Sequence, residues 1–431
     1  MKPVNFEQLG ETLYHEELSN GLNVYILPKE GFNKTFATFT TKYGSIDNQF
    51  TPHGQKDTIR VPDGIAHFLE HKMFEDEEGD VFQEFSKQGA SANAFTSFTR
   101  TAYLFSSTSN LVENLETLVD FVQHPYFTEE SVEKEKGIID QEITMYDDNP
   151  DWRAYFGVIE NMFKKHPVKI DIAGTVASIS DITKDLLYTC YETFYHPSNM
   201  LLFVVGPVDP EVVIKQVKDN QEKKTFTQPE KIVRFYPEED AVVATKKNVI
   251  HMPVQTPKCL MGFKDKETTR QGTELLKHEL ALNVLLDLMF GQSSTNYQTL
   301  FDEGLIDDSF SFDYSAEYGF GFTVIGGDTK YPDKLAERIE EMVQTFVNQS
   351  LTQDDFERVI KKKIGTFLRS LNSPEYIANQ FTRYQFNDMN LFDVVPTLEG
   401  LTVDYLVGVM KEHFNFERFT VCQVKAEGYE E

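Results

Sequence analysis

Short runs of alternating apolar and polar residues near the start of the chain predict β-strands. Residues 11–28 contain two such runs, and Asn20-Gly21 between them is a strong signal for a hairpin turn. Residues 35–45 alternate in the same way, and residues 91–109 are rich in β-branched and aromatic side chains. These patterns predict a sheet close to the N-terminus.

Elsewhere in the first half, apolar residues recur with helical spacing. Pro62 and Asp63 form a helix start in front of the mostly apolar residues 64–74, and a short amphipathic helix over 80–89 ends at Gly89. Further predicted elements are helices at 111–123, 129–146, 181–195 and 209–221, and a buried strand at 199–206.

The second half repeats this plan. Strands near 242–264, a long helix at 268–290, a short helix up to Gly304, β-rich residues 309–327, further helices and a last strand at 418–425 follow in order. A shift of 215 residues places Gly89 on Gly304, Phe95 on Phe310, Tyr103 on Tyr318 and Phe105 on Phe320. We therefore predict an α+β fold of two homologous domains, 1–222 and 241–431, joined by a charged linker at 223–240. Each domain is expected to be a mostly antiparallel sheet with helices packed on one face.

The helix at 64–74, GIAHFLEHKMF, contains two imidazoles and a carboxylate among apolar residues. His67, Glu70 and His71 share one helical face, and burying them costs free energy unless a metal ion or hydrogen bonds satisfy them. In the shifted copy, residues 282–286 read LNVLL, so the helix can form without these polar groups. The sequence therefore points to chemistry at this helix.

Two histidines leave a catalytic zinc ion one protein ligand short. Glu135 and Glu142 are two helical turns apart in the helix at 129–146, so they share a face. We predict Glu142 as the third zinc ligand and Glu135 as a group that orients a ligand or the water. The order His-x-x-Glu-His is the inverzincin pattern, in which Glu70 acts as general base toward water.

The composition of the chain indicates which binding partners and which cellular compartment to expect. The 431 residues carry a formal charge of −28, from 69 acidic and 41 basic side chains, which argues against nucleic acid or an anionic membrane surface as partner. Cys190, Cys259 and Cys422 suggest no disulfide framework. The N-terminal residues show no apolar signal-peptide core, and no stretch is apolar enough to span a membrane. We expect a cytoplasmic protein.

Four segments together resemble the pitrilysin (insulinase) family of zinc metallopeptidases, and within it the bacterial relatives of the mitochondrial processing peptidase. They are GIAHFLEHKMF, ASANAFTSFTRTAYLF, EKEKGIIDQEI and YHPSNMLLFVVG, and the similarity covers nearly the whole chain. The resemblance implies paired α+β domains, a closed chamber built from two such pairs, and zinc-dependent cleavage of short or unfolded peptides. It matches His67, His71 and Glu142 to the ligands of one zinc ion per chain, Glu70 to the base and Glu135 to the supporting glutamate.

The resemblance also implies an edge strand, near Asn93 to Phe98, to which peptides add as an extended strand. The candidate substrate contacts there are Ala92, Asn93, Ala94, Phe95 and Thr96. Family members use an arginine and a tyrosine of a C-terminal domain to stabilise the oxyanion. The matching segment, AEYGFGFTVIGGDTKYP, offers Tyr318 and Tyr331 but no arginine, with Gly321 at the expected place.

We therefore expect the metal-bearing subunit of a heterodimer, whose paralogous partner supplies the arginine–tyrosine pair. The alternative is a non-catalytic structural or peptide-binding subunit of the same fold.

Overall fold

The computed structural model describes residues 1–77 and 79–430, which form two compact units. The first unit comprises Met1–Ile143, Ile170–Tyr236 and Ser370–Phe386. The second comprises Thr144–Lys169, Pro237–Arg369 and the described residues from Asn387 onward. Each unit thus includes one segment from the other half of the sequence. The predicted domain boundaries, with a single linker at 223–240, do not include this exchange of segments.

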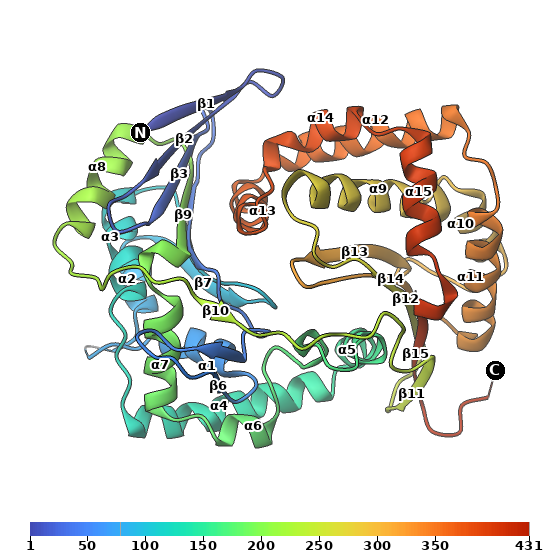
Figure 1. Ribbon diagram of the computed structural model, residues 1–431, viewed down its shortest axis with the longest axis horizontal. Coiled ribbons are helices and arrows are strands. Elements are labelled where there is room, and N and C mark those ends of the chain that lie inside the picture. Colours follow the sequence, from blue (N-terminus) through green and yellow to red (C-terminus); the bar gives the residue numbers. More distant parts are fainter. Residues whose placement is uncertain (78, 431) are drawn as a thin grey trace. The chain divides into compact units, whose positions relative to one another are not determined.

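Among the described residues, the first unit contains a sheet of seven strands (Figure 1). In spatial order they are β1 (Lys2–Phe6), β2 (Glu11–Glu17), β3 (Asn23–Pro28), β9 (Met200–Gly206), β4 (Thr35–Thr41), β8 (Thr101–Ser107) and β7 (Ala90–Thr96). The β3–β9 pair is parallel and the other pairs are antiparallel, so the predicted type of sheet and the predicted hairpin are confirmed. Strand β1 was not predicted.

The helices of the first unit include all those expected in the first half of the sequence. They are α1 (Ile65–Lys72), α2 (Phe82–Lys87), α3 (Leu111–Val122), α4 (Glu129–Asp147, up to Ile143), α6 (Val176–Ser180), α7 (Lys184–Phe194) and α8 (Pro210–Gln221), with the short 3-10 helix η2 (Pro197–Asn199). Of these, α6 and η2 were not predicted.

One further helix of this unit, α13 (Pro374–Phe386), comes from the far end of the chain and packs on β4 and β9. The rings of Phe381 and Phe203 are 4.7 Å apart. Every residue of β4 and β9 is buried, as expected for strands covered on both faces. Helix α13 lies on the side of the sheet opposite α3 and α8 in Figure 1, which adds a cover that the sequence did not predict.

The second unit repeats the arrangement with five strands among the described residues. Their spatial order is β11 (Lys247–His251), β15 (Phe419–Lys425), β12 (Lys258–Lys264), β14 (Phe320–Asp328) and β13 (Ser311–Glu317). The parallel pair β11–β15 and the antiparallel pairs that follow it reproduce the order β3-β9-β4-β8-β7 of the first unit. The predicted pair of related domains is therefore confirmed.

The helices of the second unit include α5 (Pro150–Met162) and the 3-10 helix η1 (Pro167–Lys169) from the first half of the sequence. The others are α9 (Gly272–Phe290), α10 (Thr295–Asp302), α11 (Pro332–Val347), α12 (Gln353–Ser370), α14 (Val394–Glu399) and α15 (Val403–His413), with the 3-10 helices η3 (Leu391–Asp393) and η4 (Phe416–Arg418). Helix α5, which was not predicted, packs on β12 and β15.

The shift of 215 residues holds for the short helices but not for the strands. Gly89 and Gly304 each follow a short helix with positive φ, 76° and 67°. Strand β13, however, begins at Ser311, six residues later than the shifted start of β7 would place it. The connection after α10 is longer than that after α2, so Tyr103 lies buried in β8 while Tyr318 lies in the exposed turn after β13.

Part of the expected linker belongs to the first unit. Within it, β10 (Val233–Arg234) pairs with β5 (Gln49–Thr51), which also pairs with β6 (Ile59–Arg60). The Tyr236 hydroxyl donates a hydrogen bond to Asp47 at 2.6 Å. The three cysteines, all among the described residues, are buried free thiols. Within the described ranges, no helix is both long and apolar enough to cross a membrane.

Candidate metal centre

Helix α1 holds the HFLEH motif in a fixed position in the first unit. The helix begins at Ile65, three residues later than the predicted start at Pro62, and the preceding Gly64 has a φ of 89°. A side chain at Gly64 would approach the carbonyl oxygen of Ala173 to 2.3 Å, so this left-handed, crowded position requires glycine. All residues of α1 except His71 are buried, which leaves His71 at the surface end of the motif.

The structure brings His67, His71 and Glu142 together. One ligand atom from each residue lies within 4.8 Å of the other two. His67 Nε2 is 3.6 Å from Glu142 Oε1, and His71 Nε2 is 3.4 Å from Glu142 Oε2. Two imidazole nitrogens and one carboxylate facing one point form the donor set of a catalytic zinc site, which normally keeps its fourth position for water or substrate. These residues therefore fit a zinc ion.

Glu135 contacts the opposite nitrogen of the same imidazole. His71 Nδ1 lies 3.0 Å from Glu135 Oε1, so a proton on Nδ1 leaves Nε2 as the nitrogen that can bind a metal. Burial alone would lower the pKa of His71, but the hydrogen bond to Glu135 and the charges of Glu70 and Glu142 outweigh it and raise the pKa. Glu135 thus contacts the predicted ligand His71, and its role as the orienting group stays a prediction.

Glu70 stands beside these ligands and contacts the edge strand. Its Oε2 accepts a hydrogen bond from the Thr96 hydroxyl at 2.7 Å. Burial raises the pKa of Glu70, while the charge of His67 and the Thr96 hydrogen bond lower it in part. This contact could not be predicted from the sequence, because it depends on the register of β7 relative to α1.

The predicted substrate residues lie in two different units. Ala92 to Thr96 lie in β7, which is the last strand in the order of its sheet and pairs with β8. This places them at a sheet edge, as the resemblance implied. Tyr318 and Tyr331 lie in the second unit with exposed side chains, and Tyr331 is the residue before α11.

Gly321 occupies a position where no side chain fits. A Cβ atom there would lie 2.5 Å from Asp265 Oδ2 and 3.1 Å from the Tyr314 hydroxyl oxygen. An arginine at this position would therefore run into a buried carboxylate, which gives a physical reason for the glycine.

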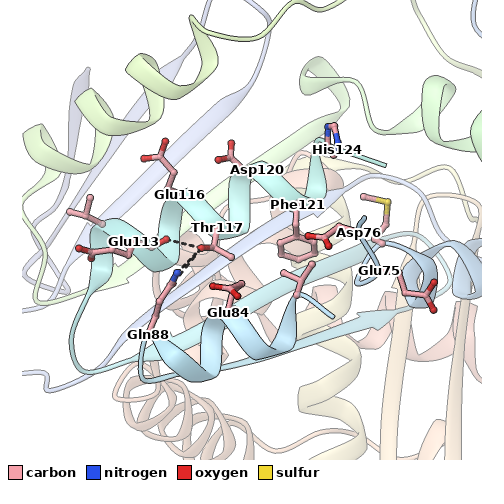
Figure 2. A pocket seen from close by; sticks show the side chains of 13 residues that line it. Glu75, Asp76, Glu84, Gln88, Glu113, Glu116, Thr117, Asp120, Phe121 and His124 are labelled. Atoms are coloured by element: carbon pink, nitrogen blue, oxygen red, sulfur yellow. Dashed lines mark hydrogen bonds between the residues drawn. The ribbon is translucent and has the colours of Figure 1, made fainter. Parts of the chain in front are cut away.

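A separate pocket of about 520 Å³ lies between α2 and α3 in the first unit (Figure 2). Its lining is acidic with an apolar floor and includes Glu75, Asp76, Glu84, Glu113, Glu116, Asp120, Val81, Val112 and Phe121. Lysines compensate several of these charges: Glu84 pairs with Lys87, and Asp120 lies 2.7 Å from Lys224. The lining does not include His67, His71 or Glu142, so this pocket is distinct from the candidate metal centre.

Comparison with known proteins agrees with the fold. Residues 60–176 match the model for insulinase (peptidase family M16), and residues 181–363 match the model for the M16 inactive domain. A relative from Bacillus subtilis, named uncharacterized zinc protease YmfH, is 65% identical over 424 residues, covering 98% of this chain and 99% of the relative. The chain belongs to the insulinase family, M16.

Solved structures place the whole M16 chain in the same fold. An M16-like peptidase from Alicyclobacillus acidocaldarius is 42% identical with a TM-score of 0.93, covering 96% of this chain and 99% of that one. A protease from Helicobacter pylori has a TM-score of 0.82 at 22% identity, and an M16 inactive domain from Pseudomonas fluorescens has a TM-score of 0.78 at 14% identity. The last two likenesses concern the fold alone. The M16 family thus includes chains named proteases and domains named inactive, so the residues of this chain must decide between the two.

Proposed function

We propose that this chain is a zinc-dependent endopeptidase that cleaves short or unfolded peptides. The observation that carries the proposal is the convergence of His67, His71 and Glu142 on one point, with Glu70 on the same helix face. The name of the relative from Bacillus subtilis, a zinc protease, supports it. The non-catalytic alternative does not account for a complete set of metal donors beside a buried carboxylate.

Each residue of the site has a separate role in this proposal. When bound, zinc supplies polarisation of the scissile carbonyl and lowers the pKa of a water molecule. Glu70 takes a proton from the attacking water and delivers it to the leaving amine. Thr96 holds the Glu70 carboxylate, and Glu135 fixes the orientation of the His71 ring.

The substrate is expected to add to the edge of the sheet at β7. Main-chain hydrogen bonds to Ala92, Asn93, Ala94, Phe95 and Thr96 would hold an extended peptide with little selection for its side chains. Thr96 lies at the end of this strand and contacts Glu70, so a peptide on β7 would lie next to the base.

The proposed enzyme works in the cytoplasm as the metal-bearing half of a heterodimer. Residues 316–332 include Tyr318 and no arginine, and Gly321 leaves no room for one. A paralogous partner would supply the arginine and tyrosine for the oxyanion and would complete a closed chamber. Loss of one such donor typically costs about 2.7–4 kcal/mol of transition-state stabilisation.

The change Glu70→Gln tests the mechanism. It keeps the size of the side chain and removes the base, so we expect unchanged zinc content and a loss of turnover of about 10²–10⁴-fold. The matched control is Glu133→Gln, which alters an exposed glutamate of α4. The measurements are hydrolysis of a flexible fluorogenic peptide, with and without candidate partners, and zinc analysis. A Glu70→Gln protein as active as the Glu133→Gln control would refute the mechanism. Zinc-loaded wild-type protein that is inactive with every partner would favour the non-catalytic subunit.

A further inference from the structure

A second group of potential metal ligands lies inside the second unit. Asp265 directly follows β12, His278 lies on α9, and His413 is the last residue of α15. One ligand atom of each lies within 4.8 Å of the other two. We call these three residues the Asp265 cluster. Their spacing in the sequence follows no metal-binding motif, so the sequence did not reveal them.

The Asp265 cluster is closed to solvent. The relative exposures of Asp265, His278 and His413 are 5%, 2% and 1%. Asp265 Oδ1 lies 2.6 Å from His413 Nδ1, and Asp265 Oδ2 accepts a hydrogen bond from the Tyr314 hydroxyl at 2.5 Å. Burial would raise the pKa of Asp265, but His413 and His278 hold it well below its usual value, so the carboxylate is ionised.

One nitrogen of the cluster has no hydrogen bond. His278 Nε2 is buried without a hydrogen-bond partner and lies 3.6 Å from Asp265 Oδ2. A buried polar atom without a hydrogen bond destabilises the folded state. In the tautomer that leaves Nε2 without a proton, a cation between this nitrogen and the carboxylate would bind both groups.

The neighbouring strand makes space for the carboxylate. Strand β14 passes Asp265 at Gly321, where any Cβ atom would collide with Oδ2. The next residue but one, Thr323, has its hydroxyl 3.3 Å from His413 Nε2. If Nε2 carries the proton, Nδ1 of His413 is free to bind a metal, and Thr323 plays the orienting role that is usual for a group beside a ligating histidine.

We propose that Asp265, His278 and His413 bind one divalent transition-metal ion that stabilises the second unit. Two imidazoles and one carboxylate suit zinc and iron(II). Four-coordinate zinc with bonds of 2.0–2.1 Å places neighbouring ligand atoms about 3.3 Å apart. Asp265 Oδ1 lies 2.6 Å from His413 Nδ1 and Oδ2 lies 3.6 Å from His278 Nε2, and one ligand atom of each residue lies within 4.8 Å of the other two, so the side chains must move to bind one ion at this spacing. The Tyr314 hydroxyl donates to Asp265 Oδ2 and so would hold the ligating carboxylate in place.

The surroundings are compatible with a cation and with a structural role. Arg270 pairs with Glu412 at 2.6 Å, and Arg418 donates to the carbonyl of Lys264 at 3.1 Å, so both nearby guanidinium groups have their own partners. The buried carboxylate of Glu279, next to His278, adds negative charge. Because the cluster is closed, the ion has no access to substrate, in contrast to the half-buried site on α1.

The experiment counts metal ions per chain in the full-length protein. Four proteins are compared: wild type, Glu142→Gln, His278→Gln and the double variant. Each is loaded with zinc and freed of excess metal. Its content of the transition metals from manganese to zinc is then measured by mass spectrometry. His166→Gln is the matched control, since it alters another buried histidine of the second unit that lies outside the cluster. Unfolding of the second unit is followed by the fluorescence of Trp152, the chain's single tryptophan, which lies on α5.

We expect two ions in wild type and in His166→Gln, one in each of Glu142→Gln and His278→Gln, and none in the double variant. His278→Gln should also lower the unfolding midpoint reported by Trp152. If His278→Gln does not fold, an anomalous difference peak at the cluster in wild-type crystals decides the question. A single ion in wild type that Glu142→Gln removes, with no peak at Asp265, would overturn the proposal and leave a hydrogen-bond network only. If Glu142→Gln instead keeps both ions, the assignment of the α1 site fails while the Asp265 cluster stands.

Discussion

At the scale of single residues, the two glutamates of α4 should separate as ligand and support. Glu142 faces Nε2 of both histidines, whereas Glu135 contacts only Nδ1 of His71. Glu142→Gln should therefore remove most zinc from this site. Glu135→Gln should weaken zinc about 10–100-fold, the usual effect of losing such an orienting partner. Competition with a chelator of known affinity measures both, and full affinity in both variants would refute the ligand assignment.

Thr96 is predicted to position Glu70 through its hydroxyl. A hydrogen bond to a charged group is worth about 1.5–3 kcal/mol, so Thr96→Val should reduce kcat at least about tenfold at unchanged zinc content. Thr96→Ser keeps the hydroxyl and should retain most activity, which separates positioning from packing in the strand. Equal rates for the valine and serine variants would show that the hydrogen bond has no part in turnover.

At the scale of elements, the edge position of β7 predicts the form of the substrate. Strand β7 ends the order of its sheet, and its main-chain groups on that side are where a peptide could pair. Peptides with N-methylated amides near the scissile bond should have a KM several-fold higher than the unmodified peptide. The methylated and the unmodified peptide have the same side chains, so only the main-chain amides differ. Unchanged KM across a methylation series would argue against strand addition.

His166, in the segment that follows α5, should make the stability of the second unit depend on pH. Burial lowers the pKa of His166 to about 4 from 6.5, with Glu239 and Lys264 acting in opposite directions. Between these two values the unfolded chain binds more protons, so stability is complete above pH 6.5 and falls as the pH drops toward 4. The loss from this group between pH 7 and pH 5 is about 2 kcal/mol. His166→Gln should reduce the pH dependence of urea unfolding followed at Trp152, and an identical slope in wild type and variant would contradict the assignment.

Helices and strands with a regular spacing of apolar residues and a turn residue at each end could be predicted from the sequence. Helix α5 shows why other elements could not. Its buried residues cover most of its faces, so no polar stripe marks a helix. Gly157 lowers helix propensity, yet a Cβ atom there would lie 2.6 Å from Cys422 Sγ, so close packing explains the glycine. The α1 ligands follow from helix spacing within one segment, whereas Asp265, His278 and His413 meet only through the tertiary fold.

At the scale of the whole molecule, the two units share segments of both halves of the chain. Residues 144–169 belong to the second unit and residues 370–386 to the first. Neither half of the sequence therefore contains all of its own unit, and a cut at 223–240 would leave β4 and β9 without α13. Function should accordingly be tested on the full chain.

The last prediction is that the full chain needs a different chain for full activity. The first unit carries every residue of the proposed catalytic zinc site, and residues 316–332 carry no arginine for the oxyanion. A homodimer would lack the oxyanion arginine in both copies. A heterodimer with a paralogue that has the arginine and lacks HFLEH would contain one complete active site. Adding such a paralogue should raise kcat at least about 100-fold, the effect expected of an oxyanion donor. Co-purification and rate measurement test this, with an Arg→Ala variant of the paralogue as control. Full activity of this chain alone, unchanged by any paralogue, would mean that Tyr318, Tyr331 or backbone amides suffice as donors.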